Sequence, residues 1–330
     1  MARAGPARHF LGAADALHAD ALARGRRCLV ALNLAAARRP AGEARLVAPP
    51  WHDSVMRSHS TMTRKPTTSR HAPPSGALAA GALAAVALGL RWLEGASPRR
   101  VERPGGHARL ARNAAVALAG GLVVAAIEAP VAKRLASLVA TRRWGLLPRL
   151  RLAAWAETAA ALVLLDYTLY LWHVANHRVP FLWRFHAVHH VDDELDVTTA
   201  VRFHPGELLL SVAVRAAQIV AIGVSPRALS RWQTLTLASV CFHHANVRLP
   251  PRLERALGRV VVTPRLHSIH HSTRRDERDA NWSSGLTWWD RAHGTLRLDP
   301  PDVAAIGVDG LPERSLLGLL ALPFEGRRAG

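Results

Sequence analysis

Histidines recur at helical spacings within one stretch of the chain, Leu171 to His190, which reads LWHVANHRVPFLWRFHAVHH. His173 and His177 lie four residues apart, and a triplet with the spacing i, i+3 and i+4 follows them. On a helix these spacings place the imidazoles on one face, so each triplet is expected to point toward one position. A second triplet with the same spacing comes much later, in RLHSIHHS. The two triplets are His186, His189 and His190, and His267, His270 and His271.

Imidazole is the commonest protein ligand for mid-row transition metals, and a helix with histidines at i and i+4 can place two nitrogens on one ion. A single histidine on an apolar face is more often a core residue, but repetition of the pattern favours a metal site. The pair and the two triplets hold eight histidines, more than one ion can bind, so the sequence predicts two metal ions. His204 in RFHPGE, and His243 and His244 in FHHANV, lie between the triplets.

The composition of the site narrows its chemistry. A set rich in imidazole and poor in thiol suits iron more than calcium, magnesium or a structural zinc. The two cysteines, Cys28 and Cys241, form no iron–sulfur, haem-attachment or disulfide pattern, so an oxygen-using enzyme would need electrons from a separate donor. Two alternatives stay open: a non-catalytic membrane metal-binding protein, and a membrane-anchored zinc hydrolase, which needs only three protein ligands.

The chain around these histidines resembles the membrane-bound fatty acid hydroxylase and sterol desaturase superfamily, whose histidine boxes read HxxxH, HxxHH and HxxHH. The resemblance runs from about Leu165 to Thr295 and is closest to the bacterial sterol-desaturase-like branch. Its segments are LDYTLYLWH, HRVPFLWRFHAVHH, TTAVRFHPGE, NVRLPPRLER, VVTPRLHSIHH and TWWDRAHGT. It implies two iron ions that activate molecular oxygen, and a lipid substrate, such as a sterol or fatty acyl chain, that is hydroxylated or desaturated.

The same resemblance implies the location and the partners of the protein. The histidine boxes would face the cytoplasm from a bacterial inner membrane, and the electrons would come from a ferredoxin-type or cytochrome-type donor with its reductase. The lipid would reach the irons without fully leaving the bilayer.

The resemblance also implies roles for individual residues. The first box is His173 and His177, and the two triplets are the second and third boxes. His244, which stands in the setting Phe242, His244 and Asn246, matches a further family histidine and is preferred to His243. His204 falls on a family position as well, although it could equally mark the start of a helix at Pro205. Ser283 and His293 depart from the usual Gly and Phe, which puts the substrate fit in question rather than metal binding.

Ligating imidazoles need their second ring nitrogen held, usually by a carboxylate or a carbonyl group. The candidate residues for this role are Asp166, Glu207, Asn246, Glu277, Asn281 and Asp290. Asp166 is favoured because it lies two helical turns before His173. The acidic run after the second box, from Asp192 to Asp196, is expected to be mostly a solvated loop that could dock a basic electron donor.

Apolar residues make up 49% of the chain and gather in segments that favour an integral membrane protein over one large soluble domain. Runs at 76–93, 114–131 and 152–172 are expected to span the bilayer, with buried soluble helices as the alternative for the Ala-rich runs. Two shorter runs, 208–224 and 229–242, are expected to form a helical hairpin that dips into the membrane. Leu316 to Phe324 is too short to span and is expected to pack against the catalytic part or to lie at the interface.

The expected architecture is all-α, with integral membrane helices and a cytoplasmic helical cap that holds the histidine-rich dimetal site. Residues 1–75 would be a disordered extension; as an alternative, translation would start at Met56 or Met62 and the residues before that start would not be part of the protein. Transmembrane helices would occupy 76–172, the histidine-box region 173–300 with the hairpin at 208–242, and a tail 301–330.

The net charge of +19 comes from 43 Lys and Arg against 24 Asp and Glu. Such a balance often indicates nucleic-acid binding, but here the basic residues are scattered between apolar segments and no nucleic-acid-binding motif is present. An anionic membrane surface is the simpler partner. The sequence therefore predicts a membrane protein without a nucleic-acid ligand.

Overall fold

A computed structural model of the chain describes residues 75–101, 106–300 and 302–325. Apart from Ser75, the expected N-terminal extension lies outside these ranges, as do both possible start sites, Met56 and Met62. Within the described ranges the chain is all-α, with isolated β-bridges but no strand, as the sequence predicts.

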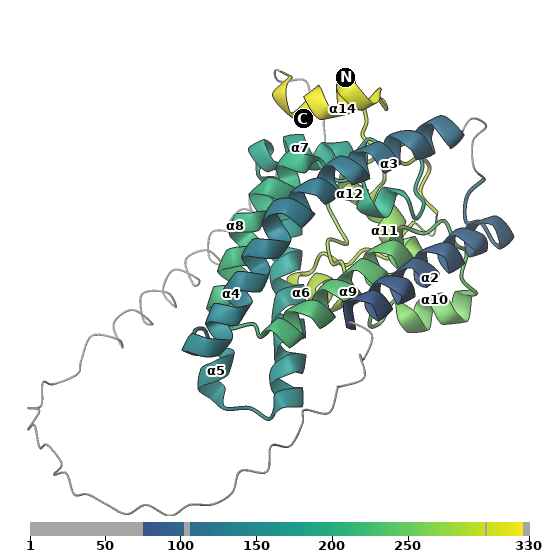
Figure 1. Cartoon of the computed structure of the whole chain (residues 1–330). Helices are drawn as coiled ribbons and strands as arrows, with labels where there is room; N and C mark the ends of the chain where they lie inside the picture. Colours follow the sequence, from purple (N-terminus) through teal and green to yellow (C-terminus); the bar gives the residue numbers. More distant parts are fainter. Residues whose placement is uncertain (1–74, 102–105, 301, 326–330) are drawn as a thin grey trace, which may run out of the picture. The chain divides into compact units, whose positions relative to one another are not determined.

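Long helices make up the first part of the described chain and also the hairpin region (Figure 1). The first run expected to span forms α2 (Ser75–Ala96), which packs against α9 (Pro226–His244). Among the described residues, three segments are long and apolar enough to cross a membrane: Gly106–Leu150, Ala154–Arg178 and Pro205–Ile222. The first two of these overlap the expected spans 114–131 and 152–172, and the third overlaps the first arm of the expected hairpin.

The second expected run is part of a much longer helix. α3 (Gly106–Val123) continues through a π-helical turn, Val124–Glu128, directly into α4 (Ala129–Arg142). Pro130 has no N–H to donate and therefore disrupts regular α-helical bonding at this point. In the π-helical turn the Ala129 N–H donates to the Val124 carbonyl five residues back, which lets the chain stay helical through the proline. A short α5 (Leu147–Leu150) follows.

The first two histidine boxes lie on either side of a sharp corner. α6 (Ala154–Arg178) ends at the extended residue Val179, because Pro180 disfavours a helical conformation in the residue before it. Pro180 then begins α7 (Pro180–His190). The expected boundary between 172 and 173 falls inside α6, so one continuous helix contains both the third expected span and the first box.

The expected hairpin forms as α8 (Pro205–Ile222) and α9. Gly223 ends α8 in the left-handed region at φ 84°, and a Cβ there would meet the Pro148 side chain at 2.4 Å. The Ser225 hydroxyl then caps α9 by accepting from the Ala228 N–H. Glycine therefore allows the close turn against α5, and α9 returns to end at His243 and His244. Insertion of this hairpin into a bilayer stays a prediction.

Short helices complete the histidine end of the molecule. They are η2 (Thr199–Val201), α10 (Pro251–Leu257), α11 (Pro264–His270), α12 (Arg275–Arg278), α13 (Trp288–His293), α14 (Leu316–Ala321) and η3 (Leu322–Phe324). α11 carries the third box. Leu319 and Leu322 in the last two elements pack in one buried cluster with Trp183 and Val188 of α7. The expected packing of Leu316 to Phe324 against the box-bearing part is thus confirmed.

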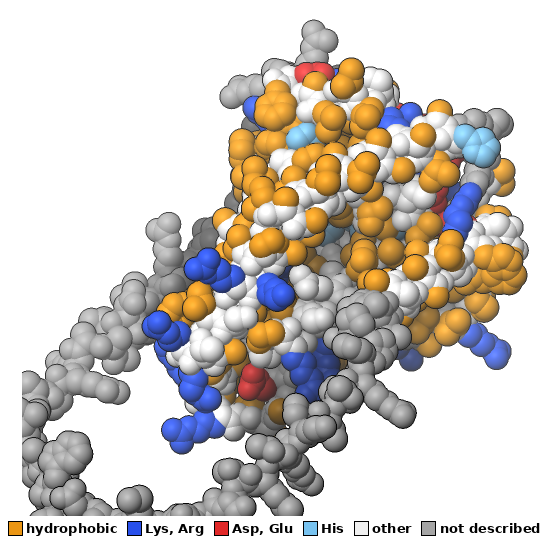
Figure 2. Space-filling model, in the orientation of Figure 1, with side chains coloured by type: hydrophobic (Ala, Val, Ile, Leu, Met, Phe, Trp, Pro, Cys, Tyr) orange, Lys and Arg blue, Asp and Glu red, His pale blue; other side chains and the backbone are white. Residues whose placement is uncertain are grey.

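The largest buried apolar cluster lies between the long helices α4, α6, α8 and α9 and includes Ala136, Leu165 and Ile219. The outer surface is also apolar: Leu118 and Leu122 are 68% and 62% exposed. In Figure 2, hydrophobic side chains cover the surface over α3 and α8, while Lys and Arg side chains gather at the far end over α4 and α5. An apolar band of this kind on long helices suits contact with lipid.

Candidate metal centre

Nine histidines meet in two groups at the ends of the long helices. Group A contains His173, His177, His186, His190 and His270, and group B contains His189, His244, His267 and His271. Within each group, one donor atom from every residue lies within 4.8 Å of the others. All are buried except His177, which is half-buried. The structure thus brings together all three predicted boxes and His244.

Each triplet is divided between the two groups, which differs from the expectation that a triplet points toward one position. His186 and His190 of α7 enter group A, whereas His189 enters group B. In α11 the pair His267 and His271 enters group B, whereas His270 enters group A. A residue advances by about 100° around an α-helix, so neighbours in sequence diverge while residues at i and i+4 stay close in direction. Each HxxHH box therefore supplies both groups.

The two groups are in direct contact. The His190 ring of group A stacks on the His271 ring of group B, with centroids 4.3 Å apart and an interplanar angle of 15°. The rings of His267 and His270 are 5.2 Å apart. The histidines therefore form one continuous cluster with two positions that could each hold a metal ion.

The inward ring nitrogens fit metal ions because they either have no hydrogen-bond partner or meet only the nitrogens of other histidines. In group A, the Nε2 atoms of His177, His186, His190 and His270 are buried without a hydrogen-bond partner. In group B, the Nε2 atoms face one another at 3.0–3.1 Å, from His189 to His244, from His244 to His267 and from His267 to His271. Buried nitrogens without partners are costly, and a cation shared among them removes that cost. Both groups therefore suit a bound metal.

Four of the outward ring nitrogens are held by backbone carbonyls. The carbonyl of Trp282 lies 2.7 Å from His173 Nδ1, that of Ala280 lies 2.9 Å from His270 Nδ1, and that of Val240 lies 2.8 Å from His244 Nδ1. The Arg202 carbonyl lies 3.3 Å from His189 Nδ1. A carbonyl can only accept, so it fixes the proton on Nδ1 and leaves Nε2 free for a metal. Sequence reasoning missed these partners because a backbone carbonyl leaves no signature in residue type.

Several side chains were predicted to hold the second ring nitrogen of a histidine. Among the described residues, Glu207 is the one of these that contacts an imidazole. Its Oε1 lies 3.0 Å from His186 Nδ1. Asp166, the favoured candidate, instead accepts from the Leu286 N–H at 3.0 Å and from the Trp289 indole N–H at 2.7 Å. Two helical turns separate Asp166 from His173 by about 10 Å along the axis, which is too far for a direct hydrogen bond.

Asp290 and Asn281 position backbone segments rather than imidazoles. The Asp290 carboxylate accepts from the N–H groups of Trp282 and Ser283, both at 3.0 Å, and so supports the carbonyl that holds His173. Asn281 has a φ of 54° and donates to the carbonyls of Leu266 and Arg297. Both predicted residues therefore act on the loop that closes over the histidines.

Asn246 and Glu277 also lack an imidazole contact. The Asn246 side chain accepts from the Arg100 N–H and donates to the Arg100 carbonyl, each at 2.9 Å, and thereby ties the chain after α2 to the end of α9. Glu277 accepts from the Ser272 hydroxyl at 2.6 Å, just after the third box. These two side chains stabilise segments next to the site.

His204, the tentative ligand, lies outside both groups. Its Nδ1 accepts from the Gly206 N–H at 2.9 Å and caps α8, and its Nε2 lies 3.2 Å from the Leu320 carbonyl. Because both nitrogens already have partners, the alternative role as a helix start is the one that the structure supports. His243 is outside both groups too, which agrees with the preference for His244.

The acidic run after the second box is partly buried, contrary to the expected solvated loop. Asp192 is 0% exposed and Asp196 is 7% exposed. Arg109 of α3 donates to Asp192 at 2.6 Å and to Asp196 at 2.5 Å, and Arg202 pairs with Glu313 at 2.7 Å. Burial opposes the charge of Asp196, but Arg109 holds the pKa of Asp196 below its usual range. We call Arg109, Asp192, Asp196, Arg202 and Glu313 the arginine–carboxylate network.

Low pH should destabilise the metal-free protein. Burial first, and neighbouring imidazoles second, hold the pKa values of five histidines of the second and third boxes well below their usual 6.5. Below about pH 6.5 the unfolded chain therefore binds more protons than the folded chain, and each such histidine lowers stability by about 1.4 kcal/mol per pH unit. The histidines concerned are His189, His190, His267, His270 and His271.

Thermal unfolding of chelator-treated protein in detergent at pH 7.5 and pH 5.5 checks this expectation. The melting temperature should fall at pH 5.5, and protein reloaded with metal at pH 7.5 should be more stable than the metal-free form. An equal melting temperature at the two pH values would show that these imidazoles titrate normally.

Comparison with known proteins agrees with this geometry. The family model described as fatty acid hydroxylase matches residues 158–295, a range that holds every histidine of groups A and B. This match and the curated relatives support membership of the histidine-bearing region, residues 158–295, in the fatty acid hydroxylase and sterol desaturase superfamily. Together with the three candidate spans, this membership supports an integral membrane protein.

Several curated relatives in this superfamily are lipid hydroxylases. The chain is 33% identical over 178 residues to ornithine lipid hydroxylase OlsE of Rhizobium tropici. This alignment covers 52% of each of the two proteins. It is 27% identical over 146 residues to a cholesterol 25-hydroxylase-like protein of Danio rerio, covering 43% of this chain and 56% of the relative. It is 25% identical over 136 residues to human alkylglycerol monooxygenase, an alignment that covers 41% of this chain and 29% of the relative. The chain thus matches about half the length of the first two relatives. No solved structure matches significantly.

Glu207→Gln should weaken metal binding by about 10- to 100-fold, the usual effect of losing a partner that holds a metal-ligating histidine. The substitution keeps the size of the side chain but removes the negative charge next to His186 Nδ1. Metal affinity is measured by competition with a chromophoric chelator. Glu277→Gln is the matched control, because Glu277 is also a buried glutamate but contacts Ser272 rather than an imidazole. Equal affinities in the two variants would remove Glu207 from the site.

Proposed function

We propose that the protein is a membrane-bound lipid hydroxylase that binds two iron ions in groups A and B and uses molecular oxygen as co-substrate. The observation that carries the proposal is the pair of adjacent, buried imidazole groups whose Nε2 atoms face inward. Group A includes His173 and His177, which lie at the end of a helix long enough to span a bilayer.

The relatives support a lipid substrate and favour hydroxylation over desaturation. The names of three of them specify ornithine lipid hydroxylase, cholesterol 25-hydroxylase and alkylglycerol monooxygenase. These substrates differ in head group and in ring structure, but all are amphiphiles that reside in membranes. A membrane lipid is therefore the substrate class that we propose for this chain.

An all-imidazole ligand set suits iron, which when bound would activate molecular oxygen, the oxidant that attack on an unactivated C–H bond requires. The residues of the chain orient and shield the site. The carbonyls of Trp282, Ala280 and Arg202 keep the protons of their histidines on Nδ1. Burial of the histidines excludes bulk water and keeps the rings neutral, which metal binding requires.

Electrons come, in this proposal, from a separate donor of ferredoxin or cytochrome type with its reductase, since the two cysteines of the sequence form no cluster motif. We further propose that the protein resides in a bacterial inner membrane with its histidine groups on the cytoplasmic side. Nucleic acid has no part in this function.

Metal analysis and lipid profiling together test the proposal. Detergent-purified full-length protein should contain two irons per chain, and host membranes with the gene should contain a lipid with one additional oxygen atom. One zinc per chain with unoxidised lipids would favour the hydrolase alternative. Bound metal without oxygen consumption would favour a non-catalytic metal-binding protein, and a lipid lacking two hydrogens would identify desaturation.

A further inference from the structure

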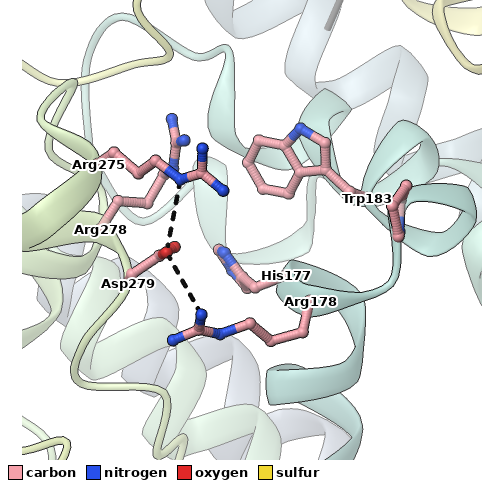
Figure 3. A pocket seen from close by; sticks show the side chains of 7 residues that line it. His177, Arg178, Trp183, Arg275, Arg278 and Asp279 are labelled. Atoms are coloured by element: carbon pink, nitrogen blue, oxygen red, sulfur yellow. Dashed lines mark ion pairs between the residues drawn. The ribbon is translucent and has the colours of Figure 1, made fainter. Parts of the chain in front are cut away.

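A small basic pocket lies at the corner between α6 and α7, directly beside group A (Figure 3). Its volume is about 140 Å³. The side chains around it include three arginines and one carboxylate, and the complete lining is His177, Arg178, Pro180, Trp183, Arg275, Arg278 and Asp279. The half-buried His177 belongs both to this lining and to group A.

The single carboxylate does not balance the charge of the pocket. Asp279 lies between Arg178 and Arg275, at 3.9 Å and 3.7 Å, so one acid serves two guanidinium groups at long range (Figure 3). Arg278 has no ion pair with any carboxylate in the described ranges, and its Nε is buried without a hydrogen-bond partner. Its guanidinium instead lies over the Trp183 ring, 4.9 Å from the centroid. The pocket therefore has unused donors and a net positive charge.

A carboxylate or phosphate group fits these donors. The planar guanidinium group offers paired N–H groups that match two oxygens of such an anion, and these charge-assisted bonds are stronger than neutral ones. Sites that enclose whole drug-sized ligands have volumes of about 300–1,000 Å³. This pocket is smaller and therefore suits the head of a ligand rather than an acyl chain or a ring system.

The rim of the pocket indicates an amphiphilic ligand. Val179 and Phe181, on either side of Pro180, are 43% and 55% exposed. Val179 directly follows α6, one of the helices that could cross a membrane, and Phe181 lies in the first turn of α7. Apolar side chains exposed next to a basic pocket, at the end of such a helix, suit a lipid whose chains lie along the helix while its head enters the pocket.

We propose that this pocket binds the carboxylate or phosphate of an anionic membrane lipid. Under the proposed function this lipid is the substrate, and its head group lies against His177. The positions of the lipid nearest to group A are then those close to the head group rather than the far end of a chain. The inference that the pocket binds an anionic lipid depends only on the pocket itself, whereas the role of that lipid as substrate depends on the proposed function.

Lipid binding by native mass spectrometry tests this site on the full-length protein in detergent. Phosphatidylglycerol should bind at least tenfold more tightly than phosphatidylcholine, which has the same chains but a head without net charge. In the double variant Arg275→Gln, Arg278→Gln, phosphatidylglycerol affinity should fall about tenfold while phosphatidylcholine affinity stays unchanged. Equal affinity for the two lipids, or an unchanged affinity in the double variant, would overturn the proposal.

Arg274→Gln is the matched control, because Arg274 precedes α12, makes its ion pairs with Asp276 and Glu277, and is not part of the pocket lining. This variant should change the affinity for phosphatidylglycerol less than twofold. A tenfold loss of affinity in it would show that binding depends on the general surface charge and not on the pocket. Arg275→Gln alone serves if the double variant is unstable, because the Arg275 side chain is 79% exposed.

Competition with inorganic phosphate tests whether the natural ligand of the pocket is a lipid or a free anion. Phosphate should compete with phosphatidylglycerol only at much higher concentration, and binding of phosphate as tight as that of the lipid would overturn the assignment to a lipid. Metal-free protein should bind phosphatidylglycerol normally. Lipid binding without turnover would therefore contradict the proposed function while leaving the pocket intact.

Discussion

His270→Ala is expected to lower lipid oxidation by more than about 100-fold and to reduce the iron content below two per chain. His270 is the member of group A that α11 contributes, and its ring lies 4.6 Å from the rings of His173 and His177 and 4.8 Å from that of His190. Loss of a partner that only orients a ligand already costs 10- to 100-fold, so loss of a ligand should cost more. Iron is measured by elemental analysis and turnover by lipid mass spectrometry.

His204→Asn is the matched control for this prediction. Asparagine can still cap α8, and His204 lies outside both groups, so the variant should keep both irons and nearly full turnover. Membrane insertion should be unchanged in both variants. Normal iron content and turnover in His270→Ala would show that group A is not a metal site, and loss of iron in His204→Asn would restore that residue as a ligand.

Asp192→Ala is expected to destabilise the protein by about 3–5 kcal/mol, the cost of removing one partner of a buried ion pair. The Asp192 carboxylate accepts from Arg109 at 2.6 and 2.8 Å, from Asn113 at 3.0 Å and from the Thr199 hydroxyl at 2.8 Å. Its removal leaves the Arg109 charge buried with fewer partners. Thermal unfolding in detergent should show a melting temperature lower by about 10 °C.

Asp276→Ala is the control for the same loss of charge at the surface. Its pairs with Arg274 and Arg297 are solvent-exposed, and pairs of this kind contribute little to stability. The melting temperature of this variant should stay close to that of the unmodified protein. Equal shifts in the two variants would show that the arginine–carboxylate network has no special structural role.

The arginine–carboxylate network also connects stability with the metal site. Arg202 donates to the Val188 carbonyl at 3.0 Å and pairs with Glu313, while its own carbonyl holds His189. Since this carbonyl orients a ring of group B, Asp192→Ala should also weaken metal binding. The acidic run that follows the second box therefore stabilises the segment between α7 and α8, and the sequence alone suggested solvent exposure there.

Spacing in the sequence was sufficient to predict which histidines lie close together, because helical periodicity is a local property. Histidines at i and i+4 remain on one side of any helix, so the pairs 173/177, 186/190 and 267/271 each enter a single group. The apolar runs likewise predict helices without knowledge of their neighbours. The all-α fold and the proposal of two metal positions follow from these local patterns.

Other features depended on contacts between distant segments. The spacing in the sequence suggests that Asp166 holds His173. In the structure, however, the Asp166 carboxylate accepts hydrogen bonds from Leu286 and Trp289 instead. His204 matches a family position, yet the C-terminal segment and the first turn of α8 use its nitrogens. Residue type and spacing contain no information on which loop arrives at a given side chain.

By itself, the sequence determined which histidines can bind metal and which segments are apolar enough for a membrane, because both depend on residues a few positions apart. Only the tertiary structure decided how the two triplets divide between group A and group B, which carbonyls orient the rings, and that Arg178, Arg275 and Arg278 share one pocket. These arrangements join α6 and α7 to segments far along the chain. They depend on long-range packing, which local periodicity does not encode.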